Sequence, residues 1–241
     1  MTKFAFLLIA LISFSAASAQ LKPKKDWSKV DIDRSGDHIM LQVGSDHWSG
    51  APDSISSRIK GFSRGLNFYI MLNKPFKSDP RWSVAFGVGV SSSNIVFKKT
   101  SVGILSTGTL LPFSNLDSSN YFKKYKLATS FLEAPIELRY TVDPSNEAKS
   151  WKFALGVKVG TMVNVHTKGK TLVNKSGSTL LSYTEKESRN TYFNTTRLAG
   201  TARVGMGHFS VFGAYSITSF LKDGAGPSIR PYQFGLTISG L

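Results

Sequence analysis

The sequence predicts an all-β fold, an eight-stranded antiparallel transmembrane β-barrel of the outer-membrane type. Three observations support this fold: eight segments alternate in polarity, their connections alternate in length, and the clearest segment is long enough to cross a bilayer. That segment runs from Trp151 to Val165, with apolar residues at almost every odd position and mostly small or polar residues between them. Successive strand residues point to opposite faces, and about 9–11 residues cross a bilayer. One face should therefore meet lipid and the other a polar lumen.

The remaining strands follow from the same alternation. The predicted strands are residues 37–44, 65–73, 82–91, 125–140, 151–165, 192–204, 209–217 and 232–239. The first, third and fifth connections are long, at residues 45–62, 97–121 and 166–190, whereas the second, fourth and sixth are short and the seventh is a short exception. Short turns on one side and long loops on the other are typical of outer-membrane barrels. A final strand can pair with the first and remove both edges.

Single strands predict a β-bulge and the positions of several side chains relative to the membrane. The pair Phe131-Leu132 breaks the alternation, and Pro135 cannot donate to a strand ladder, so we expect a β-bulge there. Two other expectations concern the membrane. Aromatic side chains mark membrane interfaces, which places Trp82, Tyr140 and Trp151 at the short-turn rim. Val157 should face lipid and resist charge, while Gly156 should face the lumen and accept a serine.

The N-terminal region reads as an export signal. Lys3, an apolar run and Ala17-Ser18-Ala19 predict a signal peptide over residues 1–19, followed by a periplasmic leader over 20–36 and the barrel over 37–241. Residues 31–37 resemble the start of a calcium loop, but Gln42 replaces the bidentate glutamate, so a turn is the favoured interpretation. We predict no metal site, no cofactor and, because cysteine is absent, no disulfide.

The chain is strongly basic, with 30 Lys and Arg against 15 Asp and Glu, a formal net charge of +15. An exported chain is not expected to meet nucleic acid, so this charge favours other anionic partners. We expect contacts with outer-membrane lipid and lipopolysaccharide phosphates, with the barrel assembly machinery, and with an extracellular ligand through the loops. The lysines near the bases of the loops are Lys98, Lys99, Lys123, Lys124, Lys168 and Lys170.

Charged residues also fall on the predicted inner wall. The candidate lumen charges are Glu137, Arg139, Lys152, Lys158, Arg197 and Arg203. Two interpretations stay open: an internal plug of ion pairs and hydrogen bonds, or a lumen that attracts anions. Side chains can fill the interior of an eight-stranded barrel. Because Glu137 is the one clear inward acid, we expect some of the cations to be hydrated, near a rim or bound to anions.

Three classes of function fit these features. A non-enzymatic structural or binding barrel is favoured, because loops on a rigid scaffold usually carry recognition and these loops hold aromatic outliers such as Trp48 and Tyr183. A small anion-preferring channel, or a barrel associated with transport or secretion, is the alternative. A rim-located lipid-modifying enzyme, using His166 with Ser182 or Ser188, is the second alternative. We predict no catalytic residue for the favoured function.

One segment resembles a known family. Residues 130–140, SFLEAPIELRY, resemble the "YLEIPLLLKY" strand of the PorT-like outer-membrane β-barrel family of Bacteroidetes, and residues 64–67 and 232–236 are similar to other strands of that family. The chain departs from the pattern at Phe131, at Glu137 and at the C-terminal Leu241, where a terminal aromatic is usual. The resemblance implies an eight-stranded outer-membrane barrel and brings no catalytic residues.

Overall fold

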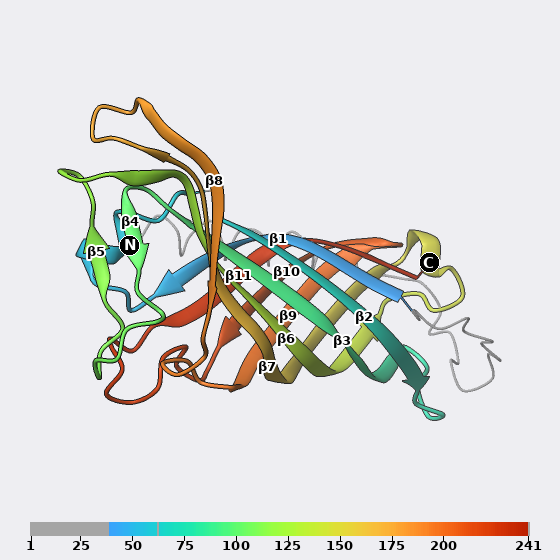
Figure 1. The fold of residues 1–241 in the computed structure, drawn as a ribbon. Helices are drawn as coiled ribbons and strands as arrows, with labels where there is room; N and C mark the ends of the chain where they lie inside the picture. Colours follow the sequence, from blue (N-terminus) through green and yellow to red (C-terminus); the bar gives the residue numbers. More distant parts are fainter. Residues whose placement is uncertain (1–38, 62, 241) are drawn as a thin grey trace, which may run out of the picture.

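The computed structural model describes residues 39–61 and 63–240. The predicted signal peptide, periplasmic leader and calcium-like segment lie outside these residues. The described chain closes into an antiparallel barrel, as predicted (Figure 1). The barrel strands, in their order around the wall, are β1 (Ile39–Ser49), β2 (Arg64–Pro75), β3 (Trp82–Phe97), β6 (Tyr121–Thr141), β7 (Trp151–Val173), β9 (Thr196–Met206), β10 (Phe209–Ser216) and β11 (Arg230–Ser239). β11 pairs with β1 from Ser239 opposite Met40 to Arg230 opposite Ser49, which closes the ring.

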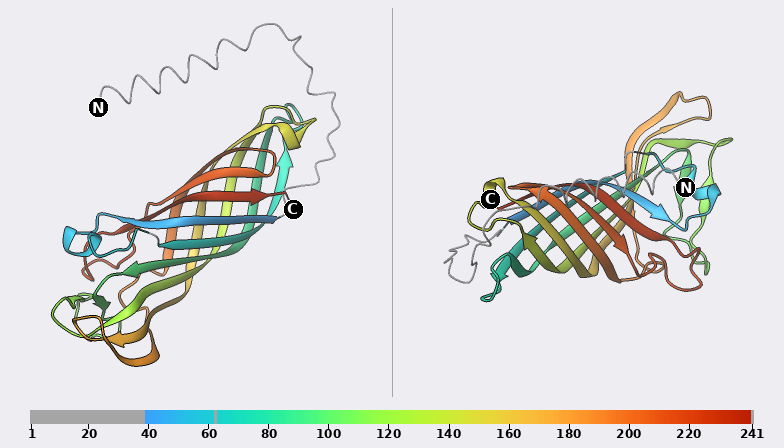
Figure 2. Two further views of the ribbon diagram at one scale, coloured as in Figure 1. Left: turned by 90° about the horizontal axis from the view of Figure 1, so that it is seen from above. Right: turned by 180° about the vertical axis from the view of Figure 1, so that it is seen from behind.

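The segments predicted as long loops contain regular structure. Shorter elements in the chain are α2 (Asp53–Ser56), β4 (Thr100–Val102), β5 (Phe113–Asn115), the 3-10 helix η2 (Glu147–Lys149) and β8 (Thr179–Ser188). The expectation of a loop at 166–190 is wrong, because β7 continues to Val173 and pairs with β8 in a hairpin. In Figures 1 and 2 this hairpin rises to the side of the barrel. Its apolar residues fall in adjacent pairs, Leu172-Val173 and Leu180-Leu181, and do not alternate with polar ones, so the strand period gave no signal in the sequence.

The outer face of the barrel wall is apolar. Val157 and Phe86 are 45% and 47% exposed, as expected of lipid-facing residues. The structure places the predicted aromatics at the short-turn rim, where Trp82 lies opposite Tyr140 with ring centroids 4.8 Å apart. Short turns mark the periplasmic end of such barrels, so the opposite end is extracellular. None of the helices in the described part of the chain has the length and hydrophobicity to cross a membrane.

The inner wall at Gly156 is tighter than expected. A Cβ atom added there would lie 2.3 Å from the carbonyl oxygen of Ile136 and 3.0 Å from Cα of Glu137. These neighbours are backbone atoms and cannot rotate away, so a serine at Gly156 requires the two strands to shift; that it costs much less than an arginine at Val157 stays a prediction. The reason is the pairing of Gly156 directly opposite Glu137, which brings the two backbones together.

A bulge does occur where the alternation breaks, but on the neighbouring strand. Ser130 pairs with Asn164, whereas Phe131 pairs with Met162, so the additional residue is Val163 of β7. β6 itself stays in regular register with β3. Because one extra residue exchanges the two faces of a strand, Val165 points inward and is only 2% exposed. The expectation that Val165 faces lipid is therefore wrong.

The extracellular end of the barrel is filled by an apolar cluster, which we call the apolar cap. The cap consists of Ile55, Ile95, Phe97, Val102, Ile104, Leu111, Tyr125, Leu127, Val165, Tyr192, Phe193, Phe220, Leu221, Ala225 and Ile229. Most of these residues come from the connections between strands, including the seventh, which runs from Ile217 to Ile229 and is not short. Trp48 packs against the cap, with its ring 5.7 Å from Phe97. This aromatic outlier therefore serves packing, not surface recognition.

Candidate functional site: the barrel interior and an extracellular groove

Two layers of ion pairs fill the lower and middle interior. In the layer nearer the short turns, the Glu137 carboxylate accepts hydrogen bonds from Arg139 (2.8 Å) and Arg203 (3.0 Å). All three side chains are 6–7% exposed. Lys152 lies at the rim below them and pairs with Glu147 at 3.0 Å. The glutamate of this layer is thus shared by two guanidinium groups.

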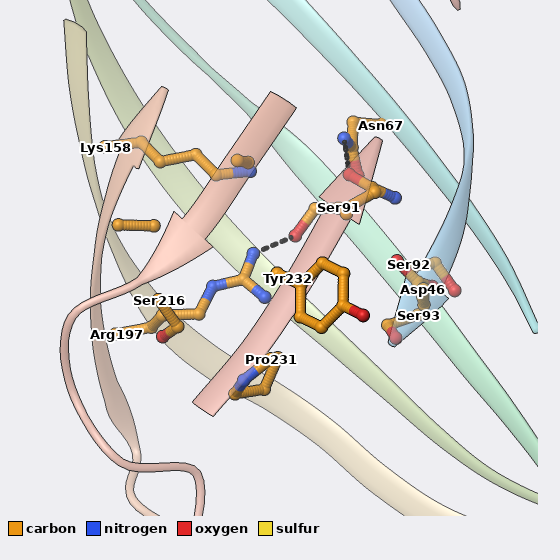
Figure 3. Close-up of a pocket in the computed structure, with 13 residues that line it drawn as sticks. Asp46, Asn67, Ser91, Ser92, Ser93, Lys158, Arg197, Ser216, Pro231 and Tyr232 are labelled. Carbon is orange, nitrogen blue, oxygen red and sulfur yellow. Dashed lines mark hydrogen bonds between the residues drawn. The ribbon is translucent and has the colours of Figure 1, made fainter. Parts of the chain in front are cut away.

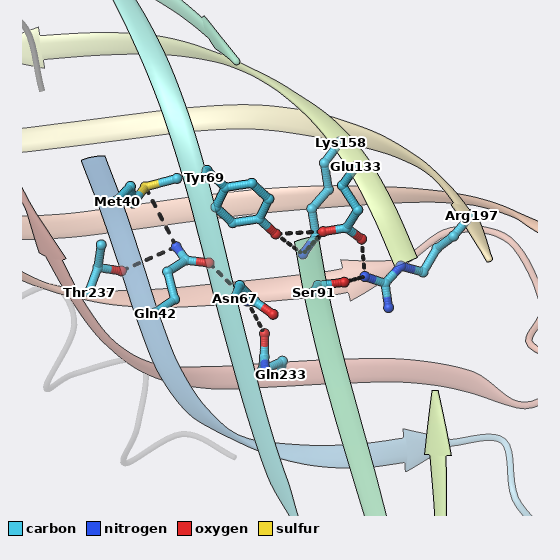
Figure 4. A network of polar contacts seen from close by, with 10 residues as sticks. All are labelled: Met40, Gln42, Asn67, Tyr69, Ser91, Glu133, Lys158, Arg197, Gln233 and Thr237. Atoms are coloured by element: carbon cyan, nitrogen blue, oxygen red, sulfur yellow. Dashed lines mark hydrogen bonds and ion pairs between the residues drawn. The ribbon is translucent and has the colours of Figure 1, made fainter. Parts of the chain in front are cut away.

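The second layer surrounds Glu133, which is 2% exposed (Figure 4). The Tyr69 hydroxyl donates to Glu133 at 2.5 Å, and Lys158 Nζ lies 3.2 Å from the same carboxylate. Arg197 bonds to its other oxygen and donates to Ser91 Oγ at 2.9 Å. Four strands, β2, β6, β7 and β9, therefore meet at one carboxylate. We call the two layers the polar plug: Tyr69, Glu133, Glu137, Arg139, Lys158, Arg197 and Arg203.

Neutral polar side chains extend this network toward β1 and β11. Asn67 donates to Gln42 at 3.0 Å and to Gln233 at 2.7 Å, and Gln42 donates to Thr237 at 3.2 Å. In Figure 4, Gln42 and Thr237 lie on the side of Tyr69 away from Arg197, and Asn67 and Gln233 lie below the Tyr69 ring. Buried polar groups need such partners, because an unmade hydrogen bond in a dry interior costs free energy. The interior is thus cross-linked around much of its circumference.

The six predicted lumen residues all reach this interior or its rim, and each contacts a partner of opposite charge. Sequence reasoning missed the central acid, Glu133, because the bulge was placed in β6 beside it. Strict alternation along β6 from Glu137 would have put Glu133 on the inner face. One cation, Lys152, lies near the rim as expected, and the other four share Glu133 and Glu137, so the interior holds one acid more than the sequence analysis counted.

The cavities that the described residues form beside the plug are small. A cavity of about 30 Å³ lies between Asp46, Ser91, Lys158, Arg197 and the β10–β11 wall (Figure 3). One water molecule occupies roughly 30 Å³ of liquid. Two further cavities in the described interior measure about 10 Å³ each. These volumes accommodate single water molecules, not a ligand.

A larger hollow lies at the extracellular end, outside the barrel. This groove has a volume of about 540 Å³ and is lined by Ser57, Arg58, Lys60, Phe97, Lys98, Lys99, Asp117, Tyr121, Phe122 and Lys123. Backbone hydrogen bonds bring two connections together to form it: Lys98 N donates to Arg58 O (2.8 Å), and within the β3–β6 connection Leu116 N donates to Lys99 O (2.9 Å). Small-molecule sites commonly measure 300–1,000 Å³, so the groove is of ligand size.

The charges around this groove are unbalanced. Asp117, its one acid, is already bonded to Arg58, with Nη2 and Oδ2 2.6 Å apart. This bond holds the pKa of Asp117 below its ordinary value. Lys99 lies over the Tyr121 ring, 5.1 Å from its centroid. Within the part of the chain that the structure describes, Lys60, Lys98, Lys99 and Lys123 form no ion pair.

The loop-base lysines thus separate into two groups. Lys98, Lys99 and Lys123 line the groove, where Arg58 and Lys60 join them. Lys124, Lys168 and Lys170 lie on the strands beside it. Sequence reasoning missed Arg58 and Lys60 because they belong to a different connection, and only the fold brings them to Lys98.

The residues of the enzyme alternative make other contacts. Ser188 Oγ donates to Val165 O at 2.8 Å, and Nδ1 of His166 lies 3.4 Å from the Asn164 amide nitrogen. The Ser188 hydroxyl is thus engaged by a backbone carbonyl. Among the described residues, no group of three or more His, Asp or Glu side chains is arranged to hold a metal ion.

One comparison with known proteins identifies the family of this chain. No curated protein matches the chain. Among solved structures, the chain is similar to Ail, the attachment invasion locus protein of Yersinia pestis, with 14% identity and a TM-score of 0.31 over 84% of this chain and 96% of that one. A second match is Ail in complex with the heparin analogue sucrose octasulfate, with 12% identity and a TM-score of 0.30 over the same shares. The family of the outer membrane protein beta-barrel domain matches residues 35–238. The chain belongs to this family of outer-membrane β-barrel proteins.

Proposed function

We propose that this protein is a non-enzymatic outer-membrane barrel that binds an anionic ligand at the cell surface. The observation that carries the proposal is the extracellular groove, where five cationic side chains face one acid that is already bonded. Cations that lack partners attract anions through both charge and hydrogen bonds. The aromatic rings of Tyr121 and Phe122 add flat surfaces that suit the apolar faces of a cyclic ligand.

The closed interior supports binding over conduction. A channel needs a continuous hydrated path, whereas the polar plug and the apolar cap occupy the barrel at successive levels. We expect little steady current from the reconstituted protein in planar bilayers. A large, stable, anion-selective current would support the channel alternative instead.

Finer assignments complete the proposal. Residues 1–19 act as a cleaved signal peptide and residues 20–36 as a periplasmic leader. The barrel assembly machinery inserts the barrel, and lipid with lipopolysaccharide surrounds it. The PorT-like assignment rests on residues 130–140, which form much of β6. The hydrogen bonds of His166 and Ser188 to other groups favour a protein without catalysis.

The test uses a compact polyanion as its probe. Full-length protein in nanodiscs is titrated with fluorescently labelled inositol hexakisphosphate at two salt concentrations. The triple change Lys60→Gln, Lys98→Gln, Lys123→Gln should weaken binding by at least about tenfold, because each lost charged hydrogen bond contributes roughly 1.5–3 kcal/mol. Salt should weaken binding by the unchanged protein.

The matched control is Lys77→Gln, which removes one cation from the short turn at the opposite end. It should leave the affinity unchanged. Asp117→Asn should strengthen binding, since it releases Arg58 and removes the one acid of the groove. Equal affinities for the triple variant and the unchanged protein would refute the groove as the ligand site.

A further inference from the structure

A second basic surface lies on the outer face of the wall, on the strands beside the groove. Lys126 of β6 pairs directly opposite Lys168 of β7, and Lys168 pairs opposite Lys186 of β8. We call these three residues the lysine row. One step farther out, Lys124 lies opposite Lys170. Directly opposite residues have Cβ atoms about 4.5–5.5 Å apart, and like charges in that position repel.

No acid on the same face relieves this repulsion. The two glutamates of β8 alternate onto the other face, where Glu187 lies opposite Thr167 and Glu185 bonds to the Tyr183 hydroxyl. Lys126 Nζ donates instead to a neutral group, the side-chain oxygen of Asn94, at 2.5 Å. Among the described residues, no carboxylate forms an ion pair with the row. Three cations in register, without counter-charges, indicate a site that is completed by an anionic partner.

The pKa of His166 is affected by the positive charges of the lysine row. It occupies the next position along this face of β7, in the extension beyond the bulge that pairs with β8. Burial lowers its pKa first, and the nearby charges of Lys186, Lys126 and Lys168 lower it further. The imidazole is therefore neutral at pH 7, so the charges of this face come from its lysines.

The level of the row above the membrane limits the type of anion. Leu132 is the last exposed apolar residue of β6, and Lys126 lies six residues farther along the strand. At about 3.3 Å per residue and a tilt of roughly 40°, this places the row about 15 Å above the apolar belt. Phospholipid headgroups extend only about 5–8 Å beyond the hydrocarbon core. A phosphate carried on a sugar headgroup reaches this level.

We propose that the lysine row binds the sugar-borne phosphates of a phosphorylated outer-leaflet glycolipid. The hairpin that carries Lys168 and Lys186 rises to the side of the barrel, over the area that surrounding lipid occupies (Figure 2). The site rests on the same outer-membrane orientation as the proposed function, but it shares no residue with the groove. It fixes one glycolipid molecule at the β6–β7–β8 side of the barrel.

The experiment measures glycolipid retention by full-length protein in nanodiscs that contain either lipopolysaccharide or its dephosphorylated form. Native mass spectrometry counts the bound glycolipid. Each basic residue near an anionic surface contributes about fivefold in affinity, so the triple change Lys126→Gln, Lys168→Gln, Lys186→Gln should weaken binding on the order of 100-fold. Dephosphorylation should weaken binding by the unchanged protein to a similar extent.

Three controls make the outcomes distinct. Lys175→Gln, in the turn of the same hairpin, should retain the glycolipid. The triple Lys→Arg variant should also retain it, and the heat-dependent gel mobility of each variant verifies that the barrel is folded. Binding of soluble inositol hexakisphosphate should not change in the row variant, which separates this site from the groove.

Two results would overturn the proposal. The first is retention of phosphorylated glycolipid by the folded Lys→Gln variant at the level of the unchanged protein. The second is full replacement of the glycolipid by phosphatidylglycerol, which would show that any anionic headgroup suffices.

Discussion

The two ends of the barrel interior are closed by different chemistry. The polar plug is built from strands, and each of its side chains projects from the wall toward a partner of opposite charge or a hydroxyl. The apolar cap is built largely from the connections, which fold inward over the extracellular mouth. The plug contacts should therefore be lost only when the barrel unfolds, whereas the cap can open while the barrel stays folded.

The largest effect should come from breaking the plug at its central acid. Glu133→Ala leaves Lys158 and Arg197 buried without their carboxylate, which should lower the free energy of unfolding by about 3–5 kcal/mol. Urea titration of barrels refolded into phosphatidylcholine vesicles measures this change. As a control, replacing the whole group by Glu133→Leu, Lys158→Met and Arg197→Met should cost far less. A loss below about 1 kcal/mol for Glu133→Ala would contradict the account.

The cap should respond with a local loss. Phe193 is fully buried in the cap, 5.0 Å from the Phe220 ring. Phe193→Ala should destabilise the closed cap by about 3–5 kcal/mol. Limited proteolysis should then cut residues 98–120 and 189–195 faster, while the heat-dependent gel mobility of the barrel stays the same. Loss of that mobility shift would show that cap and barrel form one cooperative unit.

A third change compares the two sides of the wall at one level. Arg139 and Arg203 are held inside the barrel by Glu137, whereas Val157 lies outside, beside the register partner of Glu137. Val157→Arg should cost about 2–4 kcal/mol in a vesicle folding titration, because a charge on the lipid face near the midplane has no partner. Val157→Leu is the matched control. Identical midpoints for both variants would refute the assignment of this face to lipid.

The smallest effect is expected in the short turns. Asp79 pairs with Arg81 at 2.6 Å, and both side chains are about a third exposed. The hydrogen bond from Arg81 lowers the pKa of Asp79 below its ordinary value of 3.8. The pair therefore stabilises fully above that pH and loses its effect as the pH falls through the lowered pKa. Asp79→Asn should cost about 0.5 kcal/mol at pH 7. A loss that persists at pH 2 would contradict the assigned cause.

The barrel could be predicted from sequence because its wall obeys one rule. Lipid outside and a packed lumen inside force alternate residues such as Leu155 and Gly156 to differ, and the difference survives in the sequence. The same rule failed above the membrane, where the adjacent Leu180 and Leu181 of β8 break the alternation and Val165 follows a bulge. It also failed for the groove, because Arg58 and Lys98 meet only through the folding of two distant connections.

The additional residue at Val163 shifts the register of β7 by one residue, so that the residues that follow it exchange the inner and outer faces of the wall. Below it, odd-numbered residues meet lipid; above it, they enter the cap, and His166 and Lys168 come to the outer face. Removing Val163 would exchange the two faces of the extension, directing Lys168 into the cap and Val165 into the headgroup layer. Only insertions or deletions of an even number of residues in β7 keep Lys168 on the outer face and Val165 in the cap. Whether the number of residues in β7 is even or odd therefore constrains the length of the hairpin more than the identity of any side chain does.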